Sequence, residues 1–334
     1  MRKPLRRMMR GVIGMKGYFF VLIGMMLFMW SCAVVEGGGG VGERSYVYVA
    51  GGPEGLFIID VTDPENPAEV GHLDTNGYAY GVYVSGDYAY VADGSNGLVI
   101  VDVTDPENPT EVGHIDTNNA LGVYVSGNHA YIADYTNGLV IVDVTDPSSP
   151  EEVGQIDTGD KACGVYVSGN YAYVADTSNG LVIIDVSNPN SPEERGHIDT
   201  IYACGVYVSG NYAYVADLGN GLVIIDVSDP SSPEEIGHFD TDGYAQEVYV
   251  SGNYAYIADW LNGLVIVDVS DPRDPKLAGH IDTDGWAHGV YVSGDYAYVA
   301  DWLNGLVIVD VSDPRDPKLA YDMLWMTFYS VFGM

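Results

Sequence analysis

The sequence predicts an all-β fold, a single β-propeller of seven four-stranded blades, and three observations lead to this prediction. The apolar motif GLVIVD, or a near variant, recurs seven times at intervals of 41 or 42 residues. Each interval contains four short β-prone runs that are separated by turn residues. After residue 45, no segment has the pattern of a helix. The seven motifs begin at Gly55, Gly97, Gly138, Gly180, Gly221, Gly263 and Gly305.

The last complete unit shows how the four strands of a blade follow one another. The first strand is rich in Val and Tyr, and the second alternates aromatic and small residues. The third is a continuous apolar run, which indicates that both of its faces are covered. Two prolines in the next loop stop strand pairing, and the GHIDT segment of most copies forms the fourth strand. The first three strands are predicted at Trp286–Ser293, Tyr296–Ala300 and Leu306–Val311.

The N-terminal segment has the features of a secretion signal. Residues 1–17 are basic, residues 18–30 are apolar apart from one Gly, and Ser31 and Cys32 follow. A Cys directly after such a segment resembles a bacterial lipoprotein signal, in which that Cys is lipidated. Met29 and Trp30 depart from that pattern, so ordinary secretion or an uncleaved anchor is the alternative.

These features divide the chain into three parts. We expect residues 1–32 to be a signal peptide with a lipid anchor at Cys32, and residues 33–44 to be a flexible linker. Residues 45–334 would then form the propeller outside the cytoplasm, at the cell surface or in the periplasm.

Blade one lacks a strand of its own. A recognisable first strand occurs only six times, and the copy that begins near Ser45 has none. The C-terminal tail, residues 321–334 (YDMLWMTFYSVFGM), is apolar and β-prone. Since an open ring would expose the edges of its sheets, we expect this tail to close blade one.

The charge distribution excludes several classes of partner. Six of the 13 Lys and Arg residues precede Cys32, whereas all 47 acidic residues follow it. Such an acidic surface does not bind nucleic acid, whose phosphates need a basic face. Anionic lipids would repel it, so we expect membrane contact only through the N-terminal anchor. Adaptation to high salt would also explain the acidity and is compatible with any function.

The repeated GLVIVD–V(S/T)DP unit resembles the LVIVD-repeat family of bacterial and archaeal surface proteins. The resemblance covers residues 45–320 and depends on seven copies at nearly constant spacing. It implies an extracytoplasmic propeller and no particular activity.

Variation between the copies is confined to one side of the predicted propeller. In a meander of four strands, the first and third connections share one side, and here they are nearly constant (SGNY, DVSDPxxP). The connections on the other side vary, which is typical of a binding surface on a constant scaffold. Exposed aromatic rings often anchor partners, and packing on neighbouring loops is the alternative role. The predicted binding residues are Trp260, Trp286, Trp302, Tyr78, Tyr135, Tyr202, Tyr244, Gln246 and His288.

Acidic residues on the variable side suggest two roles. In six copies the second strand is followed by an Asp, which we expect to cap its own loop. Asp240, Asp242, Asp282 and Asp284 form two Asp-x-Asp-Gly stretches, but these lack the full spacing and terminal Glu of a calcium loop. We therefore expect no cofactor, with Ca²⁺ bound at these four residues as the alternative.

The histidines and cysteines do not form a recognisable metal motif. Five histidines repeat in the fourth strand, where equivalent residues lie far apart, so we expect them to pack at the rim. Cys163 and Cys204 are equivalent residues of adjacent inner strands. Two separate buried thiols are the interpretation we prefer to a disulfide or to a soft-metal site with His288.

The chain contains no GxSxG, HExxH, Walker or CxxC motif. We therefore expect a monomeric binding or scaffold module that recognises a surface protein or a polysaccharide. The alternative is a propeller enzyme of the hydrolase or lyase type, with an axial site at Glu247 and His288 that a cation could assist.

Overall fold

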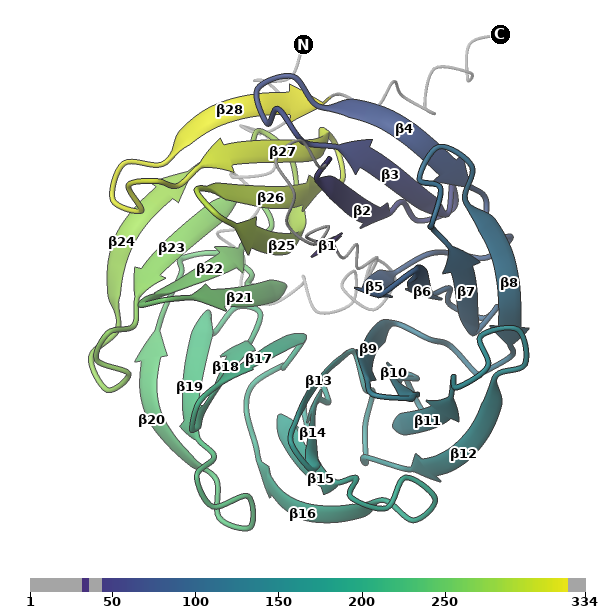
Figure 1. The fold of residues 1–334 in the computed structure, drawn as a ribbon. Helices are drawn as coiled ribbons and strands as arrows, with labels where there is room; N and C mark the ends of the chain where they lie inside the picture. Colours follow the sequence, from purple (N-terminus) through teal and green to yellow (C-terminus); the bar gives the residue numbers. More distant parts are fainter. Residues whose placement is uncertain (1–31, 36–43, 324–334) are drawn as a thin grey trace, which may run out of the picture.

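The computed structural model describes residues 32–35 and 44–323. They form a ring of seven four-stranded sheets around a central axis (Figure 1). In each sheet, strands that follow one another in the sequence are hydrogen-bonded antiparallel neighbours. The prediction of an all-β propeller with seven four-stranded blades is confirmed. Within these described ranges, the chain has no helix that is long and apolar enough to cross a membrane.

Each blade contributes one strand to each of four positions between the axis and the rim (Figure 1). The innermost strands are β1 (Cys32–Val35), β5 (Gly81–Ser85), β9 (Gly122–Ser126), β13 (Gly164–Ser168), β17 (Gly205–Ser209), β21 (Glu247–Ser251) and β25 (Ala287–Ser293). The second strands are β2 (Tyr46–Ala50), β6 (Tyr88–Ala92), β10 (His129–Ala133), β14 (Tyr171–Ala175), β18 (Tyr212–Ala216), β22 (Tyr254–Ala258) and β26 (Tyr296–Asp301).

The other two positions lie further from the axis. The third strands are β3 (Leu56–Asp60), β7 (Leu98–Asp102), β11 (Leu139–Asp143), β15 (Leu181–Asp185), β19 (Leu222–Asp226), β23 (Leu264–Asp268) and β27 (Gly305–Asp310). The outermost strands are β4 (Ala68–Leu73), β8 (Thr110–Ile115), β12 (Glu151–Ile156), β16 (Glu193–Ile198), β20 (Glu234–Phe239), β24 (Lys276–Ile281) and β28 (Lys318–Met323).

Blade one is completed by β1, so the prediction that the C-terminal tail closes it is wrong. β1 pairs antiparallel with β2, with Cys32 opposite Val49 and Val35 opposite Tyr46. The first residues of the predicted tail, 321–323, instead belong to the outermost strand of blade seven. Residues 324–334 lie outside the described residues.

The strand β1 also corrects the predicted linker, because residues 33–35 lie within it. The segment CAVV does not match the VYVSG motif of the other inner strands, and a run of glycines follows it. These two features favoured a tether. Strand pairing requires only an extended backbone beside a free edge, and β2 offers that edge. Residues 36–43 and the predicted signal segment 1–31 lie outside the described residues.

The hydrophobic core is divided among the interfaces between neighbouring blades. Successive side chains of a strand point to opposite faces, so each third strand contributes to two interfaces. In β19, Leu222 and Ile224 pack with residues of blade six, whereas Val223 and Ile225 pack with residues of blade four. This arrangement explains the continuous apolar run and confirms that the third strand is covered on both faces.

Glycines of the outermost strands allow neighbouring blades to approach closely. A Cβ atom at Gly113 in β8 would overlap the carbonyl oxygen of Pro147, in the loop that follows β11. The same contact recurs at Gly71, Gly154, Gly196, Gly237 and Gly279. In blade seven, Tyr321 occupies this position and packs against the core between blades seven and one.

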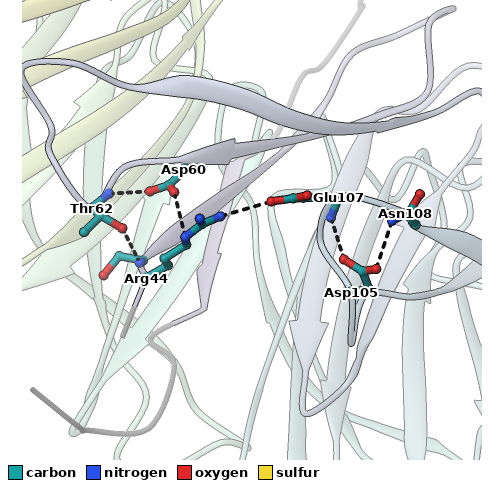
Figure 2. A network of polar contacts seen from close by, with 7 residues as sticks. Arg44, Asp60, Thr62, Asp105, Glu107 and Asn108 are labelled. Carbon is teal, nitrogen blue, oxygen red and sulfur yellow. Dashed lines mark hydrogen bonds and ion pairs between the residues drawn. The ribbon is translucent and has the colours of Figure 1, made fainter. Parts of the chain in front are cut away.

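The constant side of the propeller has the structural role that the sequence predicted. At the end of β3, Asp60 accepts a hydrogen bond from the backbone N–H of Thr62 at 2.9 Å, which caps the turn. Arg44 lies 3.7 Å from Asp60 and donates a hydrogen bond of 3.2 Å to Glu107 of blade two (Figure 2). Because Arg44 and Glu107 are exposed, this link between blades contributes little stability.

Candidate functional site

The variable face consists of the loops that join the outermost strand of one blade to the innermost strand of the next, and of the loops between second and third strands. In six of the seven blades, a buried Asp connects these two loops. Asp217 accepts hydrogen bonds from the Thr200 hydroxyl at 2.7 Å and from the N–H groups of Ile201 and Tyr202 at 3.0 and 2.6 Å. Asn220 donates a further bond of 2.8 Å to the same carboxylate. The carboxylate therefore joins two loops.

The same buried position occurs in six blades, at Asp93, Asp134, Asp176, Asp217, Asp259 and Asp301. The prediction that these residues cap their own loops is confirmed, and the structure adds the link to the preceding loop. Blade one has Gly51 here, and the ring of Phe57 occupies the space that a side chain would need.

At one loop position of the variable face, four blades have a residue other than Gly in a left-handed backbone conformation. The φ angles are 50° at Tyr135, 44° at Thr177, 39° at Leu218 and 41° at Trp260. Blades one and two have Gly52 and Gly94 at this position. A left-handed conformation costs a residue other than Gly roughly 1–2 kcal/mol. Since Gly fits the loop, these side chains are present despite a backbone cost, which is a feature of functional surfaces.

The aromatic cluster comprises Tyr244, Trp260, Trp286 and Trp302, all half-buried on the variable face of blades six and seven. The ring centroids of Tyr244 and Trp260 are 5.3 Å apart, and those of Trp260 and Trp286 are 5.7 Å apart. Trp286 and Trp302 are 4.6 Å apart. The structure thus brings together four predicted binding residues into one continuous surface. Their rings pack on one another and still keep exposed area, so the packing role applies and the binding role stays a prediction.

The other predicted aromatic residues lie elsewhere on the same face. Tyr78 contacts Tyr80 with centroids 4.7 Å apart, and the Lys161 ammonium lies 5.2 Å from the centre of the Tyr135 ring. Tyr202 is half-buried near this pair. The face therefore has two further aromatic patches outside the aromatic cluster.

The variable face is strongly acidic. Lys161 is the only Lys or Arg in its loops between residues 44 and 323. An exposed Asp begins six of the loops, at Asp74, Asp116, Asp157, Asp199, Asp240 and Asp282. The negative potential of this face favours neutral or positively charged ligands over anionic ones.

Gln246 and His288 are buried, with exposed fractions of 6% and 7%, and so lie beneath the predicted binding surface. His288 forms a β-bulge in β25, and neither of its ring nitrogens has a hydrogen-bond partner in the part of the chain that the structure describes. Burial lowers the pKa of His288 to about 4, so the ring is neutral at physiological pH. The ring centroids of His288 and Trp302 are 6.5 Å apart, which places His288 beside the aromatic cluster.

A cavity of about 320 Å³ lies on the axis, between the innermost strands. Tyrosine side chains from six blades line it, and consecutive rings in this arc have centroids 4.7–4.9 Å apart. The members of this tyrosine arc are Tyr83, Tyr124, Tyr166, Tyr207, Tyr249 and Tyr291. At blade one the register places Ala33 at the equivalent position, opposite Tyr48.

Among the described residues that line the cavity, Glu247 is the only charged one. Five other innermost strands have Gly at this position, where the neighbouring strand comes very close. A Cβ atom at Gly164, for example, would lie 2.6 Å from the Cys204 carbonyl oxygen. The strand beside Glu247 is β25, and its bulge at His288 shifts the register of β25 next to Glu247. The replacement of Gly by Glu and the bulge therefore lie on neighbouring strands, and the bulge makes room for the Glu247 side chain.

The axial enzyme site considered from the sequence is only partly assembled. Glu247 lines the axial cavity, whereas His288 is not among the residues that line it. Burial raises the pKa of Glu247 to about 7, which suits a general base. The described residues of the lining include no Ser, Thr or Lys, and burial raises the pKa of the Cys163 thiol in it to about 12.

The histidines of the outermost strands are structural. Nε2 of His72, His114, His238 and His280 lies 2.6–2.7 Å from a carbonyl oxygen 18 residues earlier in the chain. Each of these histidines therefore fastens a loop of the variable face to the rim. The prediction of a packing role is confirmed for these four, whereas His197 is exposed and its Nε2 lies 2.8 Å from Asp199 Oδ1.

The cysteines and the predicted calcium ligands do not form a shared site. Cys163 and Cys204 are buried free thiols, as we expected. Asp240 and Asp282 accept hydrogen bonds from the backbone N–H groups of Asp242 and Asp284, at 2.9 and 3.0 Å. Within residues 32–35 and 44–323, no three His, Cys, Asp or Glu residues are grouped as metal ligands would be.

The sequence places Glu247, the one Glu in a position where five other inner strands have Gly, at an axial site, and the structure shows it in the lining of the axial cavity. Sequence reasoning missed the tyrosine arc. These tyrosines repeat in every copy of the VYVS motif, so nothing in the sequence distinguishes them from scaffold residues. Residues from several blades form the arc, and only the closed ring brings them together.

The fold and its loops define a class: a seven-bladed propeller with a constant side and a variable side. The chain belongs to the LVIVD repeat family, whose repeat matches residues 44–75, 76–117, 119–158, 159–200, 202–241, 242–283 and 284–323. No curated protein matches the sequence.

Solved structures with little sequence identity share the propeller fold. A functionally unknown protein from Desulfotomaculum acetoxidans DSM 771 is 13% identical, with a TM-score of 0.65, 88% of this chain covered and 95% of that chain. The computationally designed Ika8 protein is 7% identical, with a TM-score of 0.64, and the match covers 89% of this chain and 87% of that chain. BamB from Moraxella catarrhalis is 14% identical, with a TM-score of 0.57, and the match covers 80% of this chain and 79% of that chain. These likenesses extend to the fold alone.

Proposed function

We propose that this protein is a binding module that recognises a surface protein or a polysaccharide through the aromatic cluster. The observation that carries the proposal is the continuous surface of Tyr244, Trp260, Trp286 and Trp302 on the side where the repeats differ. Packing alone does not explain a Trp at the left-handed position of blade six, because Gly occupies that position in blades one and two. Large aromatic side chains are enriched among the residues that dominate binding energy.

The charge of the variable face narrows the choice of partner. Exposed aspartates surround the aromatic rings, and Lys161 is the only nearby cation among the loops described. A neutral polysaccharide or a basic protein surface would be complementary, whereas an anionic polymer would be repelled.

The proposed location is outside the cytoplasm, with a lipid anchor at Cys32. Cleavage before Cys32 would leave β1 in the mature chain. The register places Cys32 level with Val82 of blade two, in the half of the strand nearest the variable face. While β1 stays in the ring, an anchor at this residue would hold the variable face toward the membrane. The partner we propose is therefore itself attached to the cell envelope.

Tryptophan fluorescence tests this proposal, because three of the five tryptophans lie in the aromatic cluster. Neutral polysaccharides and purified envelope proteins would be titrated against the protein. We expect a saturable change in emission. The substitution Trp286→Ala should weaken binding at least about thirtyfold, since loss of a dominant contact costs roughly 2 kcal/mol or more.

The control is Leu277→Ala, which removes a more exposed apolar side chain from the rim strand β24. This variant should bind like the parent protein. Unchanged affinity together with a lower melting temperature in Trp286→Ala would show that the aromatic cluster is a packing feature.

A further inference from the structure

The axial cavity has a lining chemistry that differs from that of the variable face. Aromatic rings of the tyrosine arc form much of its wall, together with valines and backbone. Of the lining residues that the structure describes, Glu247 is the only charged one, and none is Lys or Arg. The electron-rich faces of aromatic rings and a carboxylate both attract positive charge.

The Glu247 carboxylate has little compensation from the protein. Its one hydrogen bond among the described residues comes from the N–H of Val248, at 3.2 Å, and no ion pair includes it. It lies against Gly205, where a Cβ atom would come 2.7 Å from Glu247 Oε1. Glu247 is half-buried, and a carboxylate that is partly removed from water with a single hydrogen bond is costly. The fold does not need it, since five equivalent positions are Gly.

We propose that the axial cavity binds a small organic cation, a quaternary ammonium or amine group, with Glu247 as the counter-charge and the tyrosine arc as the wall. The volume of about 320 Å³ is at the lower end of the range of small-molecule sites. A hard metal ion such as Ca²⁺ needs six to eight oxygen ligands. The described residues provide no cluster of three acidic, His or Cys side chains here, so the chemistry favours an organic cation.

The site predicts a pH dependence, because protons and the ligand compete for one carboxylate. Burial raises the pKa of Glu247 to about 7. The pKa of Cys163 is raised to about 12, and that of Cys204 is raised well above its ordinary value, again by burial. His288, on the neighbouring strand, has its pKa lowered to about 4.

Tyr124, Tyr166 and Tyr249 of the tyrosine arc do not add a titration in this range. Burial raises the pKa of Tyr166 to about 12, and the pKa values of Tyr124 and Tyr249 are raised by burial and by neighbouring tyrosines. Asp259 also has a raised pKa, about 7, but it is held by Thr241 in a loop and does not line the cavity. Affinity should therefore be about tenfold higher at pH 8 than at pH 6, as ionisation of Glu247 requires.

Isothermal titration calorimetry with choline chloride and tetramethylammonium chloride, at constant ionic strength, tests the proposal. We expect one site per chain and the tenfold rise between pH 6 and pH 8. Glu247→Gln should abolish binding. Glu247→Gly, which restores the residue of five other blades, should also abolish it while the protein keeps its melting temperature.

Two control variants show whether binding is specific to the axial cavity. Glu235→Gln removes an exposed carboxylate from β20 and should leave binding unchanged. Trp286→Ala should also leave it unchanged, so a failure of the proposed aromatic binding surface and a failure of the axial site are distinguishable. Equal binding by the Glu247→Gln variant, or binding of CaCl₂ in place of the ammonium ions, would overturn the proposal.

Discussion

Asp217 and Asp226 lie in the same blade but have very different surroundings. Asp217 is fully buried on the variable face and accepts bonds from one hydroxyl, two backbone N–H groups and one amide. Asp226 is half-exposed at the end of β19 and accepts a bond of 3.0 Å from the N–H of Ser228. The first connects two blades, whereas the second caps a turn on the constant side.

This difference leads to a prediction for isosteric substitutions. Asp217→Asn should lower the free energy of unfolding by roughly 2–4 kcal/mol, because a buried network loses its charge and an acceptor. Asp226→Asn should cost less than about 1 kcal/mol, since water can replace the lost bond. Urea denaturation of both variants measures these effects. Equal losses would contradict the connecting role of the buried Asp.

At the level of elements, β1 decides whether the ring is complete. It is the only innermost strand that a long segment separates from its hydrogen-bonded partner, since residues 36–45 lie between β1 and β2. Without it, the β2 edge would have free N–H and C=O groups facing the axial space. Such edges favour self-association.

Truncation tests the contribution of this strand. A chain that begins at residue 36 should have a lower melting temperature than one that begins at residue 32, and it should form larger species in size-exclusion chromatography. A chain that ends at residue 323 is the control. It keeps every strand that the structure describes and should unfold like the parent. If removal of 324–334 destabilised the protein as much as removal of β1, the tail would have to close the ring after all.

At the level of the whole molecule, acidic groups dominate the pH response. Burial raises the pKa of Asp93 and Asp301 to about 6, and that of Asp259 and Glu247 to about 7. Their folded-state pKa values exceed the unfolded ones, so the folded protein binds more protons above pH 4. Stability must then fall as the pH rises through this range.

We therefore predict a higher free energy of unfolding at pH 5 than at pH 8. Glu247 alone accounts for roughly 2–3 kcal/mol of the difference, at about 1.4 kcal/mol per pKa unit. Turn-capping carboxyls such as Asp185, whose pKa is lowered to about 2 by hydrogen bonds, act oppositely, but only below about pH 4. Urea denaturation at both pH values, with Glu247→Gln for comparison, measures the effect. A variant with the same pH dependence as the parent would contradict it.

Salt concentration should also change the stability of this acidic protein. The chain carries a net charge of −34, and molar salt screens repulsion beyond about 3 Å. Screening should raise stability at pH 8 more than at pH 5, where fewer carboxylates are ionised.

Much of this architecture could be predicted from the sequence, because it depends on patterns that repeat locally. The period of GLVIVD determined the number of blades, and its unbroken apolar character showed that the third strand is covered on both faces. The contrast between constant and variable loops located the surface on which Trp260, Trp286 and Trp302 meet. The loop position of Asp217 indicated its capping role.

Other features depended on contacts between distant parts of the chain, and only the tertiary structure decided them. β1 lacks the repeated motif, yet its backbone fits the edge of β2. Gln246 and His288 follow variable positions of the sequence but are buried beneath the face. Glu247 stands where five other blades have Gly, and only the structure shows that it lines the same cavity as the tyrosine arc from six blades. The local repeat pattern determines the strands of each blade, whereas the axial cavity forms only when the blades close into a ring.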